Sequence, residues 1–460
     1  MRTRGRLHSV LDKAETGPIV EEREFDIEYI QKPIQALVKK YDVKWDKDLF
    51  LTDDDDLADR VYQAGYELAL NTGVYCTSTK RRMVWTKAEL DEVIATSPSS
   101  VIMGEGDDLA HIQARRPDED SRVAVCGGAY GIPVPENLFV PVMLSYAQEP
   151  LLDFIDNCSL VSTYGRPIRA GSPWESVACW QEVDLSFAVV NRAGRPGLAI
   201  GCAENSPTHI GEISSNSIGG FRPSDWHHAA LVSELKTNYD QLIKVAHFAR
   251  TGSHIHTFAN NIYGGYPGGA DGMAVALVAS LILLQATYFG CTVNPGPTHA
   301  NLSCDTYPAM LPGIGVALQG LNRNTNLMTT AFARTWGGPG TKNILYEAGA
   351  LALVGVTSGI ALMEGVQSAV GVQTAHCTGL EARFTAQVTH AAEKLTRKEA
   401  VPIVKALTEK YQDAMAGGDK PIGKPFDQLY DVDKVVPLPE WQGIYDEVCQ
   451  EFETEFGLKL

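Results

Sequence analysis

The chain has 460 residues, 44% of them hydrophobic, which is enough for a large buried core. Its formal net charge is −17, with 56 acidic against 39 basic residues, and this charge argues against nucleic acid as the main partner. Nine cysteines are scattered without a Cys-x-x-Cys pair, so we expect free thiols and a cytoplasmic protein. The basic N-terminal segment lacks an apolar core and is not expected to act as a signal peptide.

Residues 1–122 are predicted to form an N-terminal helical extension. Apolar residues recur at helical spacing in 21–41, 56–71 and 86–95. The acidic run 53–56 is expected to precede or cap the second of these helices, because carboxylates stabilise a helix N-terminus.

From residue 123 the pattern changes to short apolar runs that alternate with Gly-rich turns and longer helical stretches. This alternation predicts the α/β class, with a parallel sheet closed into a (β/α)8 TIM barrel over residues 123–390. Residues 391–460, charged and helical in pattern, are predicted to form a C-terminal helical extension. The predicted strands are 123–126, 160–162, 186–190, 198–201, 254–258, 292–295, 327–331 and 370–374, and a helix is predicted over 226–249.

One stretch, residues 273–290, is apolar enough to be tested as a membrane span. It contains Ser280, Gln285 and Thr287, and Gly-rich loops flank it. A transmembrane helix needs about 20 mostly apolar residues with suitable flanks. We therefore predict a buried helix of the barrel and no membrane contact.

Several segments match one known family in order and spacing, from about residue 29 to the C-terminus. They are 73–77, 137–147, 172–175, 194–197, 264–269, 378–383 and 430–432. A further segment, 195–204, has the sequence Arg-Pro-Gly-Leu-Ala-Ile-Gly-Cys-Ala-Glu and reads as a strand that ends in a turn. Together these segments resemble the monomethylamine:corrinoid methyltransferases of methanogens. In that family the position that matches Gly201 holds pyrrolysine, the residue that orients the methylamine.

The resemblance implies a barrel enzyme that moves a methyl group from a methylated amine to the Co(I) of a partner corrinoid protein. No Asp-x-His-x-x-Gly segment occurs in the chain, so the corrinoid is expected on a separate protein and no tightly bound cofactor is expected here. The resemblance also implies a symmetric homo-oligomer, as is usual for soluble enzymes.

The first candidate site is the end of the strand at Gly201. Gly201 is either a tight turn that needs a small residue or a site opened by the loss of a large side chain. Cys202 beside it could be a nucleophile, although nothing in the sequence marks it as activated. Glu204 matches an acidic residue of the family motif and is assigned a supporting catalytic role.

The second candidate site is the segment His254-Ile-His256-Thr-Phe258. Strand alternation sends these three side chains to the same face, and by the register of the family they point into the barrel. His-x-His on a barrel strand is a metal-ligand pattern, so zinc is possible, with His227 or His228 as a third candidate ligand. Neutral buried histidines are the alternative. Phe258 falls where the family has a catalytic Glu.

The remaining candidates come from two further segments. His227 matches a family His, and His228 replaces a second active-site Glu and could still move a proton. A histidine pair that caps or solvates a helix start is the alternative. Phe332 falls where the family has a Gln, and Arg334 could bind a substrate carboxylate. Trp336 and Tyr263 add aromatic faces, which attract alkylated cations.

These substitutions predict a methylated amine other than monomethylamine as the donor. A quaternary ammonium is permanently cationic and leaves as a neutral tertiary amine, so it does not need pyrrolysine. A metal-dependent hydrolase built on His254 and His256 and a binding protein without catalysis are the alternatives. We expect one cavity at the barrel mouth, larger because of Gly201, lined by Gly201, His228, His254, His256, Phe258, Phe332 and Arg334.

Overall fold

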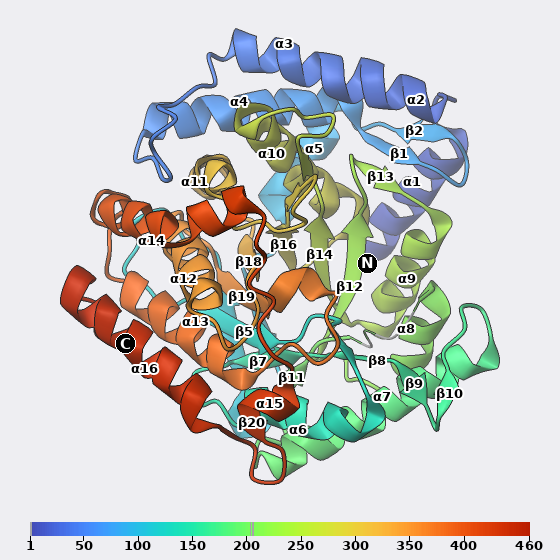
Figure 1. Cartoon of the computed structure of the whole chain (residues 1–460). Helices are drawn as coiled ribbons and strands as arrows, with labels where there is room; N and C mark the ends of the chain where they lie inside the picture. The colour runs from blue at the N-terminus through green and yellow to red at the C-terminus, as the bar shows by residue number, and fades with distance from the viewer. Residues whose placement is uncertain (1, 203, 205–206) are drawn as a thin grey trace.

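The computed structural model describes residues 2–202, 204 and 207–460, with side chains from residue 5 onward (Figure 1). Among these residues eight parallel strands form a barrel, and each strand is followed by a helix on the outside. The strands are β5 (Ala124–Gly128), β7 (Phe154–Asp156), β11 (Ala199–Ile200), β12 (Trp226–Leu231), β14 (His254–Ala259), β16 (Thr292–Pro295), β18 (Thr330–Arg334) and β19 (Leu362–Gln367). The helices are α6 (Glu136–Ala147), α7 (Pro173–Arg192), α8 (His209–Ser215), α9 (Tyr239–Thr251), α10 (Ala270–Tyr288), α11 (Leu311–Asn324), α12 (Lys342–Thr357) and α13 (Gly379–Ala392).

Two hydrogen-bonded sheets make up the barrel wall. One has the order β11-β7-β5-β19-β18 and the other the order β12-β14-β16. A parallel bridge between Val293 and Thr329 joins them beside β18. Side-chain caps mark where several helices begin: Asn238 accepts a hydrogen bond from the backbone of Gln241, and Thr378 forms a capping box with Glu381.

The N-terminal segment contains strands as well as the expected helices. The helices α3 and α4, blue in Figure 1, run across one side of the barrel, and α4 packs on α10 and α11. The hairpin of β3 and β4 closes the N-terminal end of the barrel, where Met103 and Ile112 join a buried cluster with Phe154 and Trp226. The elements are α1 (Arg2–Thr16), α2 (Glu22–Glu24), a π-helix (Phe25–Gln31), α3 (Lys32–Lys40), α4 (Asp55–Thr72), β1 (Val74–Cys76), β2 (Arg81–Met83), α5 (Lys87–Thr96), β3 (Ser100–Met103), the short 3-10 helix Gly106–Asp108 and β4 (Ala110–Gln113).

The C-terminal segment packs its helices against α12, as the red ribbons of Figure 1 show. Its elements are α14 (Arg397–Gly417), α15 (Phe426–Leu429), β20 (Tyr430–Asp431), β21 (Val436–Pro437) and α16 (Pro439–Phe456). Short strands and turns decorate the loops of the barrel: β6 (Pro133–Val134), β8 (Ser159–Leu160), β9 (Ser162–Thr163), β10 (Arg166–Pro167), β13 (Lys236–Thr237), β15 (Ile262–Tyr263), β17 (Thr298–His299), and the 3-10 turns Pro308–Met310 and Ser368–Gly371.

Four of the predicted elements were wrong in detail. Residues 186–190 lie inside α7, and 370–374 lie beyond β19 in a turn. Residues 160–162 fall in the small strands outside the barrel, while the true second barrel strand, β7, was missed. The predicted helix 226–249 is instead strand β12 followed by α9. Strand β7 was missed because it is short: a buried strand of three residues leaves almost no periodic signal in the sequence.

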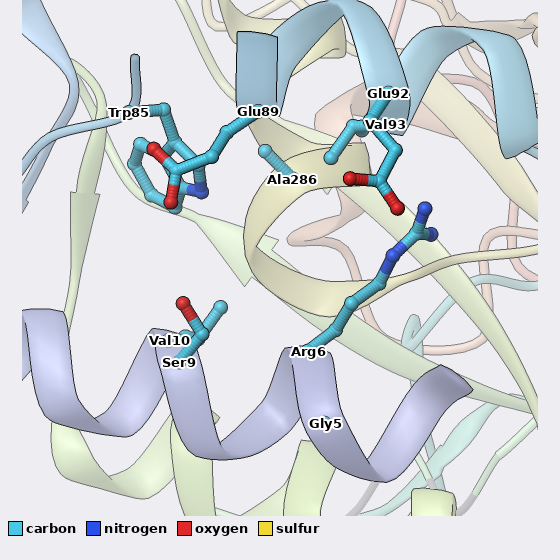
Figure 2. Close-up of a pocket in the computed structure, with 9 residues that line it drawn as sticks. All are labelled: Gly5, Arg6, Ser9, Val10, Trp85, Glu89, Glu92, Val93 and Ala286. Atoms are coloured by element: carbon cyan, nitrogen blue, oxygen red, sulfur yellow. The ribbon is translucent and has the colours of Figure 1, made fainter. Parts of the chain in front are cut away.

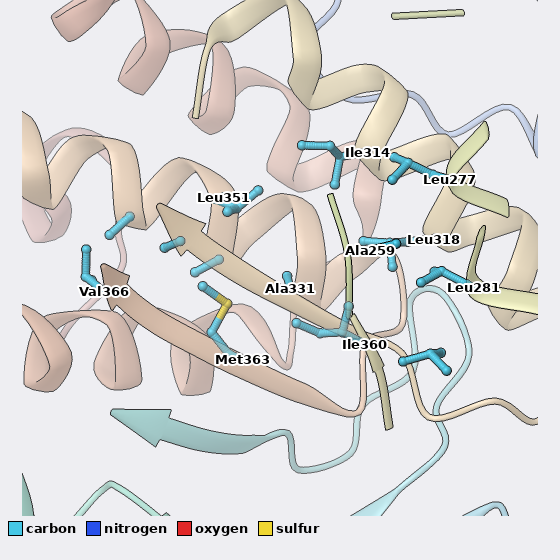
Figure 3. Close-up of a cluster of buried hydrophobic side chains, with 14 of the residues drawn as sticks. Ala259, Leu277, Leu281, Ile314, Leu318, Ala331, Leu351, Ile360, Met363 and Val366 are labelled. Carbon is cyan, nitrogen blue, oxygen red and sulfur yellow. The ribbon is translucent and has the colours of Figure 1, made fainter. Parts of the chain in front are cut away.

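The core lies where the barrel strands meet α10, α11 and α12. Figure 3 shows Leu277 and Leu281 of α10 and Ile314 and Leu318 of α11 packed around Ala259 and the neighbouring strands. Helix α10 is the one helix among the described residues with the length and hydropathy of a membrane span, and 89% of that window is buried inside the protein. Each such Leu contributes about 1.5–3 kcal/mol when fully buried. The apolar composition of α10 is therefore explained by its place in the core.

Candidate active site

A cavity of about 140 Å³ lies inside the barrel at the carboxyl ends of the strands. Strand ends of a TIM barrel carry its chemistry. Charged, amide and aromatic side chains from five of the barrel strands and from the loops that follow the strands converge on it. The lining residues are Tyr130, Glu204, His228, His256, Phe258, Asn260, Asn294, Gly296, Phe332, Arg334, Glu364 and Gln367.

A second cavity of about 330 Å³ lies between α1 and α5, far from the strand ends (Figure 2). Its lining includes Arg6, Trp85, Glu89 and Glu92. Glu89 already forms an ion pair with Lys13 at 2.8 Å. This cavity brings together none of the residues that the sequence predicts for catalysis.

Gly201 allows a close approach of Asp156. A Cβ at this position would lie 2.2 Å from Asp156 Oδ2 and 2.9 Å from Trp226 Nε1. The Trp226 indole donates a hydrogen bond to Asp156 Oδ2 at 3.2 Å, and both side chains are fully buried. The expectation that Gly201 leaves a larger void was wrong, because Asp156 and Trp226 fill the space beside it. Gly201 itself is not part of the cavity lining.

His228 stands between two carboxylates. Its Nε2 lies 3.4 Å from Asp156 Oδ2 and its Nδ1 lies 3.1 Å from Glu204 Oε1. Burial alone would lower the pKa of His228, but Cys202 and Asp156 beside it raise that pKa well above its usual value. Burial, together with the charge of Glu204, raises the pKa of Asp156 to about 7. Burial opposes the charged form of Glu204, yet its bond with His228 lowers the pKa below the usual value.

Cys202 belongs to the same group. Its Sγ lies 3.2 Å from His228 Nδ1 and 3.4 Å from Glu204 Oε1, to which the thiol donates. Burial raises the pKa of the Cys202 thiol well above its usual value. His228 favours the thiolate, but burial outweighs this effect, and a thiol held in its protonated form is a poor nucleophile.

His256 pairs with Glu364 on the opposite wall. The distance from His256 Nε2 to Glu364 Oε2 is 3.3 Å, and His256 Nδ1 lies 2.7 Å from the Thr292 hydroxyl. Asn294 donates to the other oxygen of Glu364 at 2.9 Å. Burial lowers the pKa of His256. Glu364 is only 1% exposed, and His256 and Asn294 hold this carboxylate inside the barrel.

His254 and His227 lie outside the cavity. His254 Nε2 lies 3.0 Å from the backbone oxygen of Ile102, at the N-terminal end closed by β3 and β4. His227 points away from the barrel interior, where it bonds Asn216 at 2.8 Å and stacks on Phe248. Burial lowers the pKa of His227 to about 3. The predicted metal pair of His254 and His256 is not formed, because the two side chains reach different partners at different depths.

Arg334 faces the cavity beside an aromatic wall. Its Nε donates to Gln367 at 2.7 Å and its Nη1 donates to Thr298 at 2.6 Å, while the guanidinium carbon lies 5.4 Å from the Phe332 ring centre. Phe332 packs edge-on against Tyr130 at 4.9 Å. Phe258 completes the wall from β14. The cavity therefore joins a cationic group, aromatic faces and buried carboxylates.

Two predicted aromatic residues stand apart from the lining. Tyr263 packs on His299 and Tyr307, with ring centres 5.3 and 5.9 Å away. Trp336 is 4% exposed, and its backbone donates to the buried carboxylate of Glu347 at 2.7 Å.

Sequence reasoning missed several residues of the site. Asp156 lies on β7, which was not predicted, and Glu364 and Gln367 lie on β19, which was placed too late. The signal for the latter pair was present, because an apolar run that ends in polar residues is typical of a barrel strand end. The other missed lining residues are Tyr130, Asn260, Asn294 and Gly296.

Comparison with known proteins places the chain in one family. The family model described as "Monomethylamine methyltransferase MtmB" matches residues 6–458. MtmB2 of Methanosarcina acetivorans is 31% identical and MtmB of Methanosarcina mazei 30% identical, each over 447 residues that cover 97% of both chains. The crystal structure of the Methanosarcina barkeri monomethylamine methyltransferase superposes with a TM-score of 0.95 at 29% identity, covering 99% of this chain and 98% of that one. The TIM-barrel expectation is thereby confirmed, and the chain belongs to the monomethylamine methyltransferase MtmB family.

Proposed function

We propose that this protein transfers a methyl group from a methylated amine other than monomethylamine, a quaternary or bulky N-methyl compound, to the corrinoid of a separate partner protein. Membership of the MtmB family supports methyl transfer. The observation that carries the difference in donor is the packing at position 201. Where the family resemblance expects pyrrolysine, Gly201 lies against the Asp156 carboxylate, 2.2 Å from where a Cβ would begin.

The charges around the cavity support a donor with both a cation and an anion. Glu204 and Glu364 offer negative charge and Phe258, Phe332 and Tyr130 offer aromatic faces, which suit an alkylated ammonium. Arg334 offers a planar donor fork for a carboxylate on the same small molecule. A betaine combines these two groups.

The size of the cavity supports a small donor. Its volume is about 140 Å³. A protein cavity of about 150 Å³ holds benzene. Glycine betaine is somewhat larger than benzene, so the cavity suits a small quaternary donor of about this size.

A quaternary donor needs no acid group to protonate its nitrogen as the C–N bond breaks. The partner's corrinoid supplies a Co(I) nucleophile for the methyl carbon, and the electron pair of the broken C–N bond stays on the nitrogen, which leaves as a neutral amine. The tasks left to this chain are to orient the ammonium and to exclude water. We assign the orienting role to Glu204, His228 and the aromatic wall. His227 lies behind the strand, so its predicted catalytic role is withdrawn.

The proposal is tested by methyl transfer in a reconstituted system. The purified chain is mixed with a corrinoid protein from the same source, reduced to Co(I), and the cobalt spectrum is followed after addition of glycine betaine, choline, trimethylamine or methylamine. We expect reaction with quaternary donors and none with methylamine. Reaction with methylamine alone would overturn the proposal, and donor binding without any transfer would favour the non-catalytic alternative.

Arg334→Gln sharpens the test. We expect its KM for glycine betaine to rise about 100-fold, the order expected for loss of a charged bidentate contact. Its reaction with choline, which has no carboxylate, should change little. Arg250→Gln, on the exposed face of α9, is the matched control.

Two further expectations remain proposals. A homo-oligomer is proposed from the family resemblance, and light scattering at working concentration tests it. A cytoplasmic location is proposed because the nine cysteines are scattered along the sequence without a Cys-x-x-Cys pair.

A further inference from the structure

Three different metal-ligand types converge at one edge of the cavity. Cys202 and Glu204 come from the turn that follows β11, and His228 comes from the adjacent strand β12. Among the described residues these three form the one group of Cys, His, Asp or Glu donors close enough to hold a metal ion. The distances are 3.2 Å from sulfur to Nδ1, 3.4 Å from sulfur to Oε1 and 3.1 Å from Nδ1 to Oε1.

These distances match one face of a tetrahedral zinc site. Zinc binds sulfur at about 2.3 Å and histidine nitrogen or carboxylate oxygen at about 2.0–2.2 Å. Tetrahedral angles then place two nitrogen or oxygen donors about 3.3 Å apart and sulfur about 3.6 Å from either. The observed edges lie within a few tenths of an ångström of these values, so the three side chains need only a small outward movement to admit the ion.

The surroundings of His228 provide an independent observation. With Nδ1 turned to Cys202 and Glu204, its Nε2 faces the Asp156 carboxylate at 3.4 Å. Within the described part of the chain, neither this Nε2 nor Asp156 Oδ1 has a hydrogen-bond partner. A histidine that binds a metal nearly always directs its other nitrogen to a carboxylate or carbonyl, which fixes the ring. Asp156 stands where that carboxylate is needed.

We propose that Cys202, Glu204 and His228 bind a zinc ion, with the fourth coordination position open to the cavity. A thiolate with an imidazole selects zinc over the hard cations magnesium and calcium. The charge balances, since one thiolate and one carboxylate neutralise Zn²⁺ and the imidazole is neutral. Glu204 and His228 both line the cavity, so the fourth ligand is water or a nitrogen, oxygen or sulfur atom of a small molecule with a free electron pair.

This inference goes beyond the proposed function and does not depend on it. With the ion bound, Glu204 and His228 would be its ligands, and Glu364 and the aromatic wall would be left to orient an ammonium. A quaternary nitrogen has no free electron pair and cannot bind the ion. Amines that keep an electron pair can, and coordination would then withdraw that pair as full alkylation does. The metal site would therefore also admit donors that are not quaternary, namely secondary and tertiary N-methyl amines with a free electron pair.

The test measures metal directly, on the full-length protein without a histidine tag. Zinc content is determined by mass spectrometry, the metal is removed with a chelator, and Co²⁺ is added as a spectroscopic probe. We expect about one zinc per chain, and with Co²⁺ the visible bands of a tetrahedral site together with a near-ultraviolet sulfur-to-cobalt band. A chain purified with no zinc that also gives no cobalt bands would overturn the proposal.

Variants decide which residues bind. Cys202→Ser should abolish the sulfur-to-cobalt band and lower zinc affinity at least 100-fold, and Glu204→Gln should lower it at least 10-fold. The matched controls are Cys291→Ser, whose thiol bonds a backbone oxygen, and His254→Gln at the far end of the barrel. Both controls should bind zinc like the wild type. A sulfur-to-cobalt band that survives in Cys202→Ser would overturn the assignment, whatever the outcome of the betaine assay.

Discussion

Replacing Gly201 by alanine tests whether Asp156 truly fills the space at this position. The new Cβ would lie 2.2 Å from Asp156 Oδ2, where ordinary contacts begin at 3.4 Å, so the carboxylate must retreat by about 1.2 Å. It cannot retreat freely, because Trp226 Nε1 lies 2.9 Å from the same Cβ and bonds the same oxygen. Overpacking of this kind costs about 1–3 kcal/mol of unfolding free energy.

Denaturant unfolding is the right assay for this variant. Unfolding entropy of about 2.1 cal/mol/K per residue means that 1 kcal/mol shifts the melting temperature of a chain of 460 residues by only about 1 °C. The midpoint and slope in urea resolve the change better. Gly443→Ala is the matched control, because Gly443 lies inside α16 with open space where its Cβ would be. The control should gain about 0.5–1 kcal/mol.

A double variant separates the contact with Asp156 from other causes. In an Asp156→Ala background, the cost of Gly201→Ala should fall by about 1 kcal/mol or more, because the closest atom is gone. If Gly201→Ala is no more destabilising than Gly443→Ala, the explanation given for Gly201 is refuted. It is also refuted if Gly201→Ala lowers the free energy of unfolding equally with Asp156 present and with Asp156→Ala.

Two further predictions concern buried carboxyl groups. Burial raises the pKa of Glu381 from 4.5 to about 7. The folded state therefore holds this proton more tightly than the unfolded state, and the free energy of unfolding falls as pH rises from 4.5 through 7. Glu381→Gln should reduce this fall by up to about 3 kcal/mol, measured by urea unfolding at about pH 5 and pH 8. An unchanged pH dependence in the variant would contradict the assignment. Arg383 donates two hydrogen bonds to the Glu149 carboxylate, of 2.7 and 2.8 Å, and Glu149 is only 1% exposed. Arg383→Leu should lower the free energy of unfolding by about 3–5 kcal/mol, because it leaves a buried charge unpaired. Adding Glu149→Leu should recover part of that loss. No recovery in the double variant would show that the ion pair is not the cause.

The parts of the fold that were predictable from sequence are those with repeated local signals. The helix over 273–290 was found because its apolar run is long. The strand at 254–258 was found because β-branched residues alternate with histidines at its start. The strand β19 was misplaced for a specific reason. The tripeptide Gly-Val-Gln occurs at 365–367 and again at 371–373, and only the first copy belongs to the barrel. Tertiary pairing with β5 and β18 chooses between them, and such pairing leaves no local trace.

The candidate site shows the same division. Alternation along β14 correctly put His256 and Phe258 in the cavity, but it also put His254 there, since alternation reports the face of a strand and not the depth along it. His227 points away from the barrel interior and His228 points into it, because successive side chains of β12 point to opposite faces. Reading that segment as a helix start hid this difference. The family register placed His228 in the site, whereas local pattern could not.

The pairing of Gly201 with Asp156 also bears on how the site could be changed. If Gly201 were simply a missing side chain, a long residue placed there would refill an open space. The structure shows instead that a carboxylate from the neighbouring strand β7 occupies the first position of any such side chain, with Trp226 and His228 bonded or paired to it. A long side chain at 201 would therefore have to displace three coupled groups. Because Asp156 also faces the proposed zinc ligand His228, a long residue at 201 would disturb the proposed zinc site as well.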